Sequence, residues 1–433
     1  MRGRPVIRCF LAGALWALPA AGLAAGGSFA AGFYTRGIEA ATYMDQGAAV
    51  ADPFYVPAKA GTILPRVSLA VAHEDNVFLD PDEPKSGTSV SLAPGLLALW
   101  GRPTDNHLYA DYGLVIPIYE SAREMSDRPS HLLRLGGLYQ TGKSQIRGEL
   151  GYRALEDVDA AVGARIAQQD LFADVNLEHR ISGKSSAGAL GRFERHLFDS
   201  DRYREYDRLY GAGRYYRRAS AKSEVFVQAG LGRDEPLEPI HASGAADFHD
   251  VSLGLRGKHS PKFNSSGRFG YMWRTYDEEA REDFAHWIAA WKAESNPFGL
   301  STFSLELYGD VRPAIDAEGV DVVDQGVVGS VSRRLFVERL RGNASVTLGR
   351  IDYSGGGAAG GGADEDESLV RDGRRDDYWG FSLGVDWWTR QHMSLGLAYS
   401  YMERNGSRNG DEAAQDATSY EQGRWTFRAS WNY

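Results

Sequence analysis

The final stretch of the chain, Gly423–Tyr433, alternates strictly between two kinds of side chain. Side chains along a β-strand point to opposite faces with a period of two, so each kind occupies its own face. The apolar face holds Trp425, Phe427, Ala429, Trp431 and Tyr433, and the polar face holds Arg424, Thr426, Arg428, Ser430 and Asn432. In a water-soluble sandwich the aromatic face would form the core, whereas in a membrane barrel it would meet lipid.

The same alternation recurs along most of the chain. It marks about eighteen strands, each long enough at roughly 10 residues to cross a bilayer when tilted. The clearest lie at 67–71, 90–100, 108–116, 133–139, 146–152, 171–177, 225–229, 251–255, 269–273, 287–291, 303–307, 379–387, 393–401 and 425–433. Two further segments, 185–196 and 205–217, are ambiguous in phase, and the strand at 325–333 has the weakest pattern. No apolar run beyond the amino terminus is long enough for a transmembrane helix.

Short and long connections take turns between these strands. The short ones lie at 101–106, 141–143, 182–184, 218–221, 260–263, 295–299 and 389–390, and the long ones at 75–87, 120–129, 155–168, 232–247, 311–323, 354–376 and 403–420. Membrane barrels have short periplasmic turns and long outer loops. The sequence therefore predicts an all-β fold, a transmembrane antiparallel up-and-down β-barrel of about 18 strands in a bacterial outer membrane.

The amino terminus predicts three regions. Residues 1–25 have a basic start, a short apolar segment and small residues suited to cleavage, as in a signal peptide. Residues 26–65 do not alternate well and are expected to form a periplasmic extension or a small lumenal insert, and 66–433 the barrel. Cleavage would remove the single cysteine, Cys9, so no disulfide is expected. It would also remove three arginines and shift the net charge from −10 to −13, which disfavours nucleic-acid binding.

The polar strand faces predict a wet interior, because burying so many charges in a dry core would cost several kcal/mol each. The pore-lining candidates are Arg134, Arg147, Glu149, Arg153, Asp174, Arg256, Arg268, Arg274, Glu306, Asp386, Arg424 and Arg428. Two interpretations stay open. A ladder for an anionic solute could be formed by Arg147, Arg153, Arg268, Arg274, Arg424 and Arg428, or the arginines could pair with carboxylates and brace the wall. Inward-facing Tyr109, Tyr206 and Tyr210 would offer stacking surfaces for sugar rings.

Other chemistry finds little support in the sequence. The ten histidines are scattered, and none joins a serine in a Gly-x-Ser-x-Gly motif, so an enzyme is not expected. Metal-ligand spacings are missing too, and neither a metal nor a cofactor is expected. Acidic runs such as Asp364–Glu367 are either solvated loops or sites for divalent cations that bridge lipopolysaccharide.

Two stretches resemble known outer-membrane proteins. The closing strand, with Phe427, Trp431 and Tyr433, resembles the signal with which bacterial barrels end, which implies recognition by the barrel-assembly machinery. The segment Arg66–Gly101 contains His73-Glu74-Asp75-Asn76-Val77-Phe78 and Leu92-Ala93-Pro94-Gly95-Leu96. It resembles the opening of the β-barrel porin 2 family, although His73 stands where an aromatic residue is usual. Relatives of that family that are similar to capsule or exopolysaccharide proteins imply a role in moving a polysaccharide.

Three functions follow as hypotheses. The first is a pore for export or passage of a polysaccharide, with an anionic polymer as one candidate and an export apparatus as partner. The second is a general nutrient-diffusion porin. The third is a structural or adhesive surface barrel whose long loops at 354–376 and 403–420 make the contacts. Lipid and lipopolysaccharide are expected partners in all three.

Overall fold

The structure is a computed structural model, and it describes most of the chain beyond residue 60. The described residues are 61–80, 83–102, 105–120, 128–159, 164–200, 203–237, 245–277, 281, 283–315, 320–336, 339–354, 374–390, 392–407 and 419–432. The predicted signal peptide and almost all of the predicted N-terminal extension lie outside them and stay predictions. The first strand begins at Thr62, within the last residues of that extension.

Eighteen strands of 11 to 17 residues make up the described part of the chain. They are β1 (Thr62–Glu74), β2 (Gly87–Gly101), β3 (His107–Tyr119), β4 (Ser130–Gln140), β5 (Ser144–Asp159), β6 (Ala164–Arg180), β7 (Ser185–Phe198), β8 (Tyr206–Arg218), β9 (Ser223–Pro236), β10 (Ala246–Ser260), β11 (Phe263–Tyr276), β12 (Phe284–Ser295), β13 (Ser301–Pro313), β14 (Asp321–Arg334), β15 (Leu340–Ser354), β16 (Arg375–Arg390), β17 (Met393–Ser407) and β18 (Tyr420–Asn432). Among these residues there is no helix that is long and apolar enough to span a bilayer.

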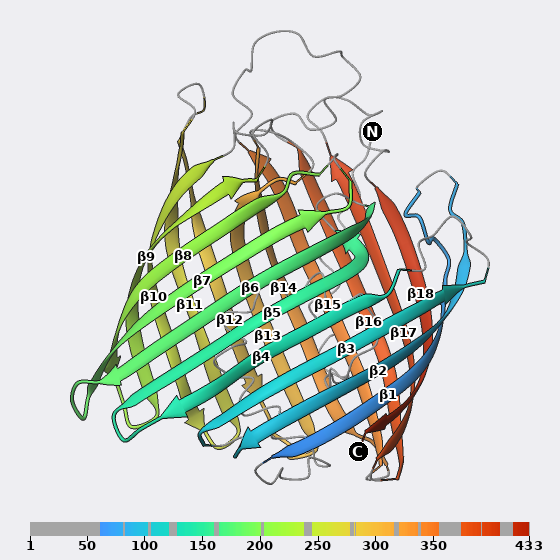
Figure 1. The fold of residues 1–433 in the computed structure, drawn as a ribbon, viewed down its shortest axis with the longest axis horizontal. Helices are drawn as coiled ribbons and strands as arrows, with labels where there is room; N and C mark the ends of the chain where they lie inside the picture. The colour runs from blue at the N-terminus through green and yellow to red at the C-terminus, as the bar shows by residue number, and fades with distance from the viewer. Residues whose placement is uncertain are drawn as a thin grey trace.

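Each strand pairs antiparallel with its neighbours in sequence, and β1 pairs with β18 to close the ring (Figure 1). At this seam Val67 lies opposite Trp431 and Val71 opposite Phe427. Closure satisfies the backbone hydrogen bonds of every strand within the sheet, which a bilayer requires because it offers no partners. The predicted all-β, up-and-down barrel of about eighteen strands is confirmed.

The outer surface of the barrel is apolar. Leu253 and Phe269, cross-strand neighbours near the middle of β10 and β11, expose 61% and 62% of their surface. Equivalent exposed residues on other strands include Leu69, Leu92, Leu108, Leu135, Leu150, Val175, Leu209, Val227, Leu305, Val346, Leu383, Leu397 and Phe427. Soluble monomers rarely expose apolar patches beyond about 600 Å². This belt encircles the barrel, so its surroundings are lipid.

Aromatic side chains bound the apolar belt along β16. Its outward face reads Trp379, Phe381, Leu383, Val385 and Trp387, with an aromatic residue at each end and aliphatic residues between. The two tryptophans are eight residues apart in a strand, which corresponds to about 26 Å. That length matches the apolar band of outer-membrane barrels, whose aromatic girdles lie at the two interfaces.

Short connections gather at one rim, together with the end of β18, and longer ones at the other (Figure 1). Four of the predicted long loops are shorter than expected, because paired strands continue into 155–168, 232–247, 311–323 and 403–420. The polar residues there break the apolar alternation without breaking the backbone ladder. The strand β15 was missing from the predicted segments, because few large apolar side chains mark its outer face.

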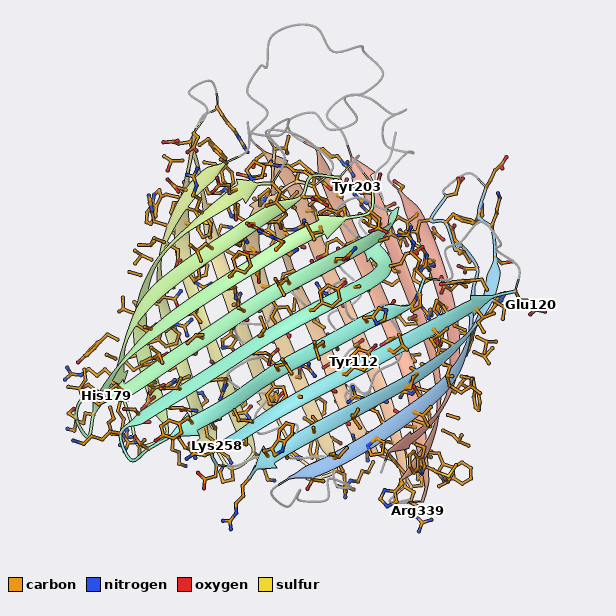
Figure 2. All side chains as sticks on the ribbon, viewed as in Figure 1. Tyr112, Glu120, His179, Tyr203, Lys258 and Arg339 are labelled. Carbon is orange, nitrogen blue, oxygen red and sulfur yellow. The ribbon has the colours of Figure 1, made fainter. Side chains whose placement is uncertain are left out.

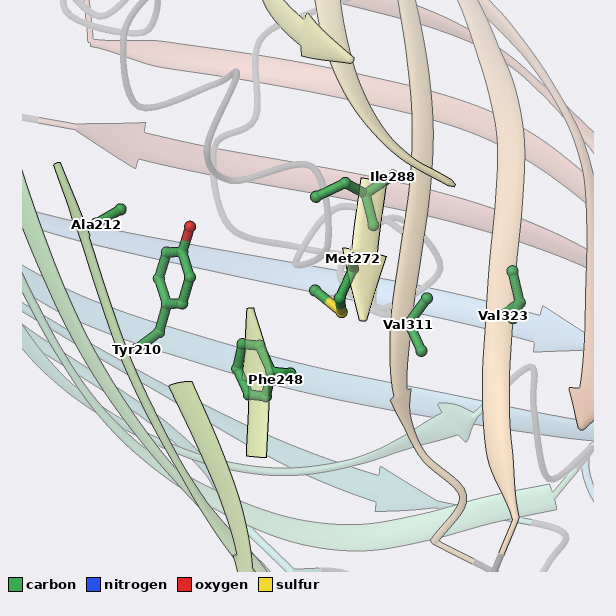
Figure 3. Close-up of a cluster of buried hydrophobic side chains, with 7 residues drawn as sticks. All are labelled: Tyr210, Ala212, Phe248, Met272, Ile288, Val311 and Val323. Atoms are coloured by element: carbon green, nitrogen blue, oxygen red, sulfur yellow. The ribbon is translucent and has the colours of Figure 1, made fainter. Parts of the chain in front are cut away.

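The hairpin formed by β13 and β14 leaves the barrel wall at its tip. Pairing between β12 and β13 stops at Ala289 and Gly309, although β13 continues to Pro313. Beyond that point Val311 and Val323 pack inside the barrel, in one cluster with residues of β8, β10, β11 and β12 (Figure 3). The wall residues of this cluster are Tyr210, Ala212, Phe248, Met272 and Ile288.

The connection at the tip of this hairpin reaches still farther across the interior. Ile315 packs against Ile166 of β6 and Tyr206 of β8. The backbone N–H of Arg204 donates to the carbonyl oxygen of Ile315 at 2.8 Å, and the Arg208 guanidinium donates to the carbonyl of Val311 at 3.1 Å. The inward-folded hairpin, for which the structure describes residues 310–315 and 320–324, therefore narrows the barrel from β13 toward β6–β8.

Candidate functional site

Polar side chains on the inner strand faces pair with one another around the barrel. Each alternates with the exposed apolar residues of the same strand, so it points to the interior. The carboxylate of Asp111 on β3 accepts hydrogen bonds from two arginines. Arg134 of β4 donates to it at 2.9 Å and Arg66 of β1 at 2.6 Å. Nearby, the hydroxyl of Tyr109 donates to the carboxylate of Glu149 on β5.

A second group joins β5, β6 and β7. The Arg153 Nε donates to Asp170 at 2.8 Å, and Nδ1 of His196 lies 2.7 Å from the other oxygen of that carboxylate. Four residues farther along β6, the carboxylate of Asp174 accepts a hydrogen bond from the Nε of Arg192 at 2.7 Å. Both carboxylates therefore have cationic or imidazole neighbours on the adjacent strands.

Arg256 of β10 forms a two-carboxylate bridge. Its guanidinium donates to both oxygens of Glu178 on β6, at 2.7 and 2.8 Å, and to Glu224 on β9 at 2.8 Å. The same guanidinium lies 3.9 Å from the ring centroid of Tyr216, a cation–π contact. Because Glu178 and Arg256 belong to strands four positions apart, this bridge joins distant parts of the wall.

A buried network lies under the inward-folded hairpin. Asp250 accepts from the hydroxyl of Tyr210 at 2.5 Å and from Arg268 at 3.3 Å. Gln228 donates to the same hydroxyl at 2.7 Å and accepts from Arg214. This network connects β8, β9, β10 and β11 on their inner faces.

Next to it runs a chain of ion pairs from β8 to β14. Arg208 contacts Asp234 at 2.7 Å, Asp234 contacts Arg274 at 2.7 Å, and Arg274 contacts Asp321 at 3.1 Å. Asp321 belongs to the inward-folded hairpin, so this chain ties the hairpin tip to the wall. Arg274 is only 1% exposed.

The barrel seam carries its own pairs. Arg424 of β18 lies 3.3 Å from Glu74 of β1, which also binds Arg165 of β6. Farther along β18, Arg428 lies 3.1 Å from Asp386 of β16, and Asn343 donates to that carboxylate at 2.6 Å. These contacts brace the strands on both sides of the β1–β18 junction.

Ten of the twelve predicted pore-lining residues thus have described polar partners on the inner face. The two others, Arg147 at an inward position of β5 and Glu306, a buried residue of β13, also interact with neighbouring groups. The six arginines proposed as an anion ladder do not form one continuous free row, since Arg153, Arg268, Arg274, Arg424 and Arg428 each pair with a carboxylate. The contacts favour the bracing interpretation for these five. That all twelve border a conducting pore stays a proposal.

Several interior residues escaped the sequence analysis. Asp321 and Arg374 lie in stretches predicted as loops, where a charged side chain is most simply solvated, and Arg204 and Arg281 lie between predicted strands. In the structure they are buried, and Arg374 pairs with Asp376, which also binds Arg404. These residues are buried because the hairpin and the neighbouring rim segments fold toward the interior. No local sequence pattern predicts that inward fold.

Of the predicted assembly signal, Phe427 and Trp431 face outward and are exposed to the lipid side. Tyr433 lies outside the described residues, as does the acidic run Asp364–Glu367. The assembly role and cation binding by acidic loops therefore stay predictions.

Comparison with known proteins gives structural neighbours but no family. No protein-family model matches the chain, and no curated protein matches it in sequence. Pseudomonas aeruginosa OpdK, solved with vanillate, is 8% identical over 86% of this chain and 99% of its own, with a TM-score of 0.45. Pseudomonas aeruginosa OccK2 (OpdF), in complex with glucuronate, is 11% identical over 86% and 100%, with a TM-score of 0.45. Acinetobacter baumannii OccAB4 is 12% identical over 88% and 100%, with a TM-score of 0.45.

Identities and scores this low carry no argument about solutes, so the assignment rests on this chain's own geometry. A closed antiparallel barrel with an even number of strands and an apolar exterior is the architecture of bacterial outer-membrane proteins. Barrels of about 16 to 18 strands leave room for an aqueous channel. The protein is therefore an outer-membrane β-barrel of the pore-forming type.

Proposed function

We propose that this protein is an outer-membrane channel for the diffusion of small polar solutes. The observation that carries the proposal is the inward-folded hairpin inside a barrel of pore-forming size. Its tip touches β6 and β8 through Ile315 and so narrows the passage, while β14 stays paired with β15 up to Asp321. A narrowed, charge-lined passage suits solutes of the size of a sugar or an amino acid.

The interior wall supports the same function. Its ion pairs, such as Arg256 with Glu178 and Arg428 with Asp386, keep strongly polar groups at the inner face. Charged groups of this kind are tolerated where water reaches them, and a hydrated wall lets polar solutes pass. The pairs also hold the wall rigid, so the passage keeps a fixed width.

Polysaccharide passage is a second candidate, supported by the resemblance of Arg66–Gly101 to the β-barrel porin 2 family. Two observations weigh against it. A polymer would need a clear path past the hairpin. Two of the tyrosines proposed to stack on sugar rings already have protein partners. Tyr206 stacks on His196 with ring centroids 4.6 Å apart, and the hydroxyl of Tyr210 donates to Asp250.

Conductance and solute size together test the proposal. Purified protein in planar bilayers is expected to conduct ions, and liposomes containing it are expected to swell with glucose but not with long dextrans. Block of the current by an added acidic polysaccharide, with passage of that polymer into liposomes, would favour the second candidate. Complete absence of conductance would favour the third hypothesis, a structural or adhesive surface barrel.

A hairpin variant sharpens this test. Ile315→Asp places a charge in the contact with Ile166 and Tyr206, so the tip should move away and single-channel conductance should rise. The matched control is Ile181→Asp in a short connection at the opposite rim, where the side chain is exposed and conductance should not change. Equal conductance in both variants would remove the hairpin as the narrowing element.

A further inference from the structure

A groove on the lipid-facing side of the wall lies near the short-connection rim. It crosses β5, β6 and β7 and has a volume of about 370 Å³. Leu177 and Ile146 are exposed apolar residues that border it. Because this side of the barrel meets the bilayer, the groove is open to lipid. The outward-facing residues that line it are Ser144, Ile146, Leu177, His179, Ala187 and Ala189.

Glycines extend the depression toward the middle of the bilayer. Gly191 of β7 lies opposite Gly211 of β8, and Ala189 lies opposite Gly213. A Cβ atom at Gly191 or at Gly213 would meet no heavy atom within 4 Å, so internal packing does not require glycine at either position. The space beside these glycines therefore stays open to a group from outside the protein.

The length of the depression matches one leaflet of the bilayer. Ser185, at the rim end of β7, and Gly191 are six positions apart, which corresponds to about 20 Å along a strand. Strands of outer-membrane barrels are tilted by about 35–45°, so this run crosses roughly 15 Å of the membrane. That depth is close to half of an apolar band of about 25 Å. One acyl chain therefore fits along the depression.

Basic side chains gather at the rim end of the groove. Three turns lie side by side there, because the backbone N–H of Arg180 donates to the carbonyl of Lys143 at 2.8 Å. In the same way the backbone N–H of Arg218 donates to the carbonyl of Lys184 at 2.8 Å. The exposed cations of these turns that form no ion pair with any described residue are Lys143, Arg180, Lys184, Arg217 and Lys222.

The acidic residues of these strand ends do not offset that charge on the outer face. Within the described ends of β4 to β9 at this rim they are Glu178 and Glu224, and both point inward and bind Arg256, at 2.7 and 2.8 Å. Arg217 by contrast shares the outer face, where it lies opposite Ser185. The rim end of the groove is therefore positively charged.

We propose that this groove binds an anionic phospholipid of the periplasmic leaflet. The phosphate lies among His179, Lys184 and Arg217 at the short-connection rim, where Figure 2 labels His179, and one acyl chain lies along Ala189 and Gly191. Short turns of outer-membrane barrels face the periplasm, and the lipids of that leaflet are phospholipids. Basic clusters at a membrane surface attract anionic headgroups. The inference goes beyond the channel function, because it concerns the outer face of the wall and involves no solute.

Native mass spectrometry of the purified full-length protein tests the site, because it counts the lipids that stay bound. Phosphatidylglycerol, phosphatidylcholine and lipopolysaccharide are added separately in a nonionic detergent. One phosphatidylglycerol per barrel is expected to bind about tenfold more tightly than phosphatidylcholine. Equal affinity for the two phospholipids, or tighter binding of lipopolysaccharide, would overturn the assignment.

A double variant, Lys184→Gln with Arg217→Gln, tests the headgroup contacts. Loss of two cations should weaken phosphatidylglycerol binding by about 25-fold, at about fivefold for each cation. The matched control is Arg333→Gln with Arg334→Gln, which removes two exposed arginines from the end of β14 at the same rim. The control should bind within about twofold of the unmodified protein. Equal losses in the two double variants would overturn the site, because the whole rim would then attract the lipid.

A second variant, Gly191→Leu, tests the acyl-chain contact. The leucine should weaken phosphatidylglycerol binding by about tenfold, because it displaces roughly two methylene groups from the depression. The control is Gly329→Leu on the outer face of β14, where an added Cβ also meets nothing within 4 Å, so both variants should fold. Equal binding by the two would overturn the groove as the site. A protein dimer that persists without lipid and is lost in Gly191→Leu would overturn the proposal too, because the groove would then hold a second copy of the chain.

Discussion

Interior arginines of this barrel stabilise it by holding carboxylates that belong to different strands. Arg274 is almost fully buried and contacts both Asp234 in the wall and Asp321 in the hairpin. The guanidinium also lies over the ring of Phe248. A buried charge with fixed partners stabilises only as a set, because removing one member leaves the others desolvated.

Loss of this central arginine should therefore be costly. Arg274→Gln is expected to lower the free energy of unfolding by about 3 kcal/mol, since it leaves two buried carboxylates with fewer partners. Urea unfolding in lipid vesicles, followed by tryptophan fluorescence, measures the change. The control is Arg350→Gln, which breaks an exposed pair with Asp377 and should cost less than about 1 kcal/mol. Similar losses in the two variants would contradict the buried, mutually dependent set.

A single lipid-facing residue tests the outer surface in the same way. Leu253→Arg is expected to cost about 2 to 4 kcal/mol, because it places a charge near the bilayer midplane. The same substitution at Phe336, which is fully exposed in a turn between β14 and β15, should have almost no effect. Equal stability of the two variants in vesicles would show that Leu253 does not face lipid.

At the scale of single elements, β18 has two tasks. It closes the barrel against β1, with Trp431 opposite Val67, and it presents an aromatic face to the lipid. Its inner face carries Arg424 and Arg428, which pair with Glu74 and Asp386. The strict alternation of its sequence is what allows one strand to serve both faces.

The assembly signal predicts a position-specific defect in β18. Phe427→Ser is expected to slow insertion into the outer membrane, seen as accumulation of the form that does not change its gel mobility on heating. Trp425→Ser removes an aromatic residue of similar exposure from the same face and is the control. If both variants insert equally slowly, the aromatic face would matter only for lipid contact, and Phe427 would have no separate assembly role.

For the molecule as a whole, the two rims are chemically and geometrically distinct. Long connections and the inward-folded hairpin lie at one rim, and short connections and the end of β18 lie at the other (Figure 1). Lys258 and Arg339 lie toward the short-connection rim and Tyr203 toward the other (Figure 2). In outer-membrane barrels the short turns face the periplasm, which sets the orientation of the whole protein.

This orientation gives a topology prediction. An epitope inserted between residues 355 and 373 should be accessible to antibody on intact cells. The same epitope inserted in the turn at 141–143 should become accessible only after the outer membrane is permeabilised. The reverse pattern of accessibility would show that the barrel has the opposite orientation, with the inward-folded hairpin on the periplasmic side.

Most of the wall could be predicted from sequence alone. Period-two alternation fixes which side chains of a strand share a face, and lipid outside with water inside reverses the pattern of a soluble sandwich. For this reason β10 could be predicted from the alternation around Leu253, and β17 from the alternation around Leu397. The strand β15, with few large apolar residues on its outer face, was not.

The sequence by itself determined the barrel, its compartment and the inward orientation of the charged faces, because each depends on spacing within a single strand. Only the tertiary structure decided which arginine pairs with which carboxylate, and that the hairpin of β13 and β14 folds inward. Those features depend on strands far apart in the chain, as with Arg256 and Glu178, and on hairpin residues such as Val311 and Val323 whose sequence looks like a solvated loop. Burial of Arg204 and Arg281 likewise depends on contacts between distant segments, which no local sequence pattern encodes.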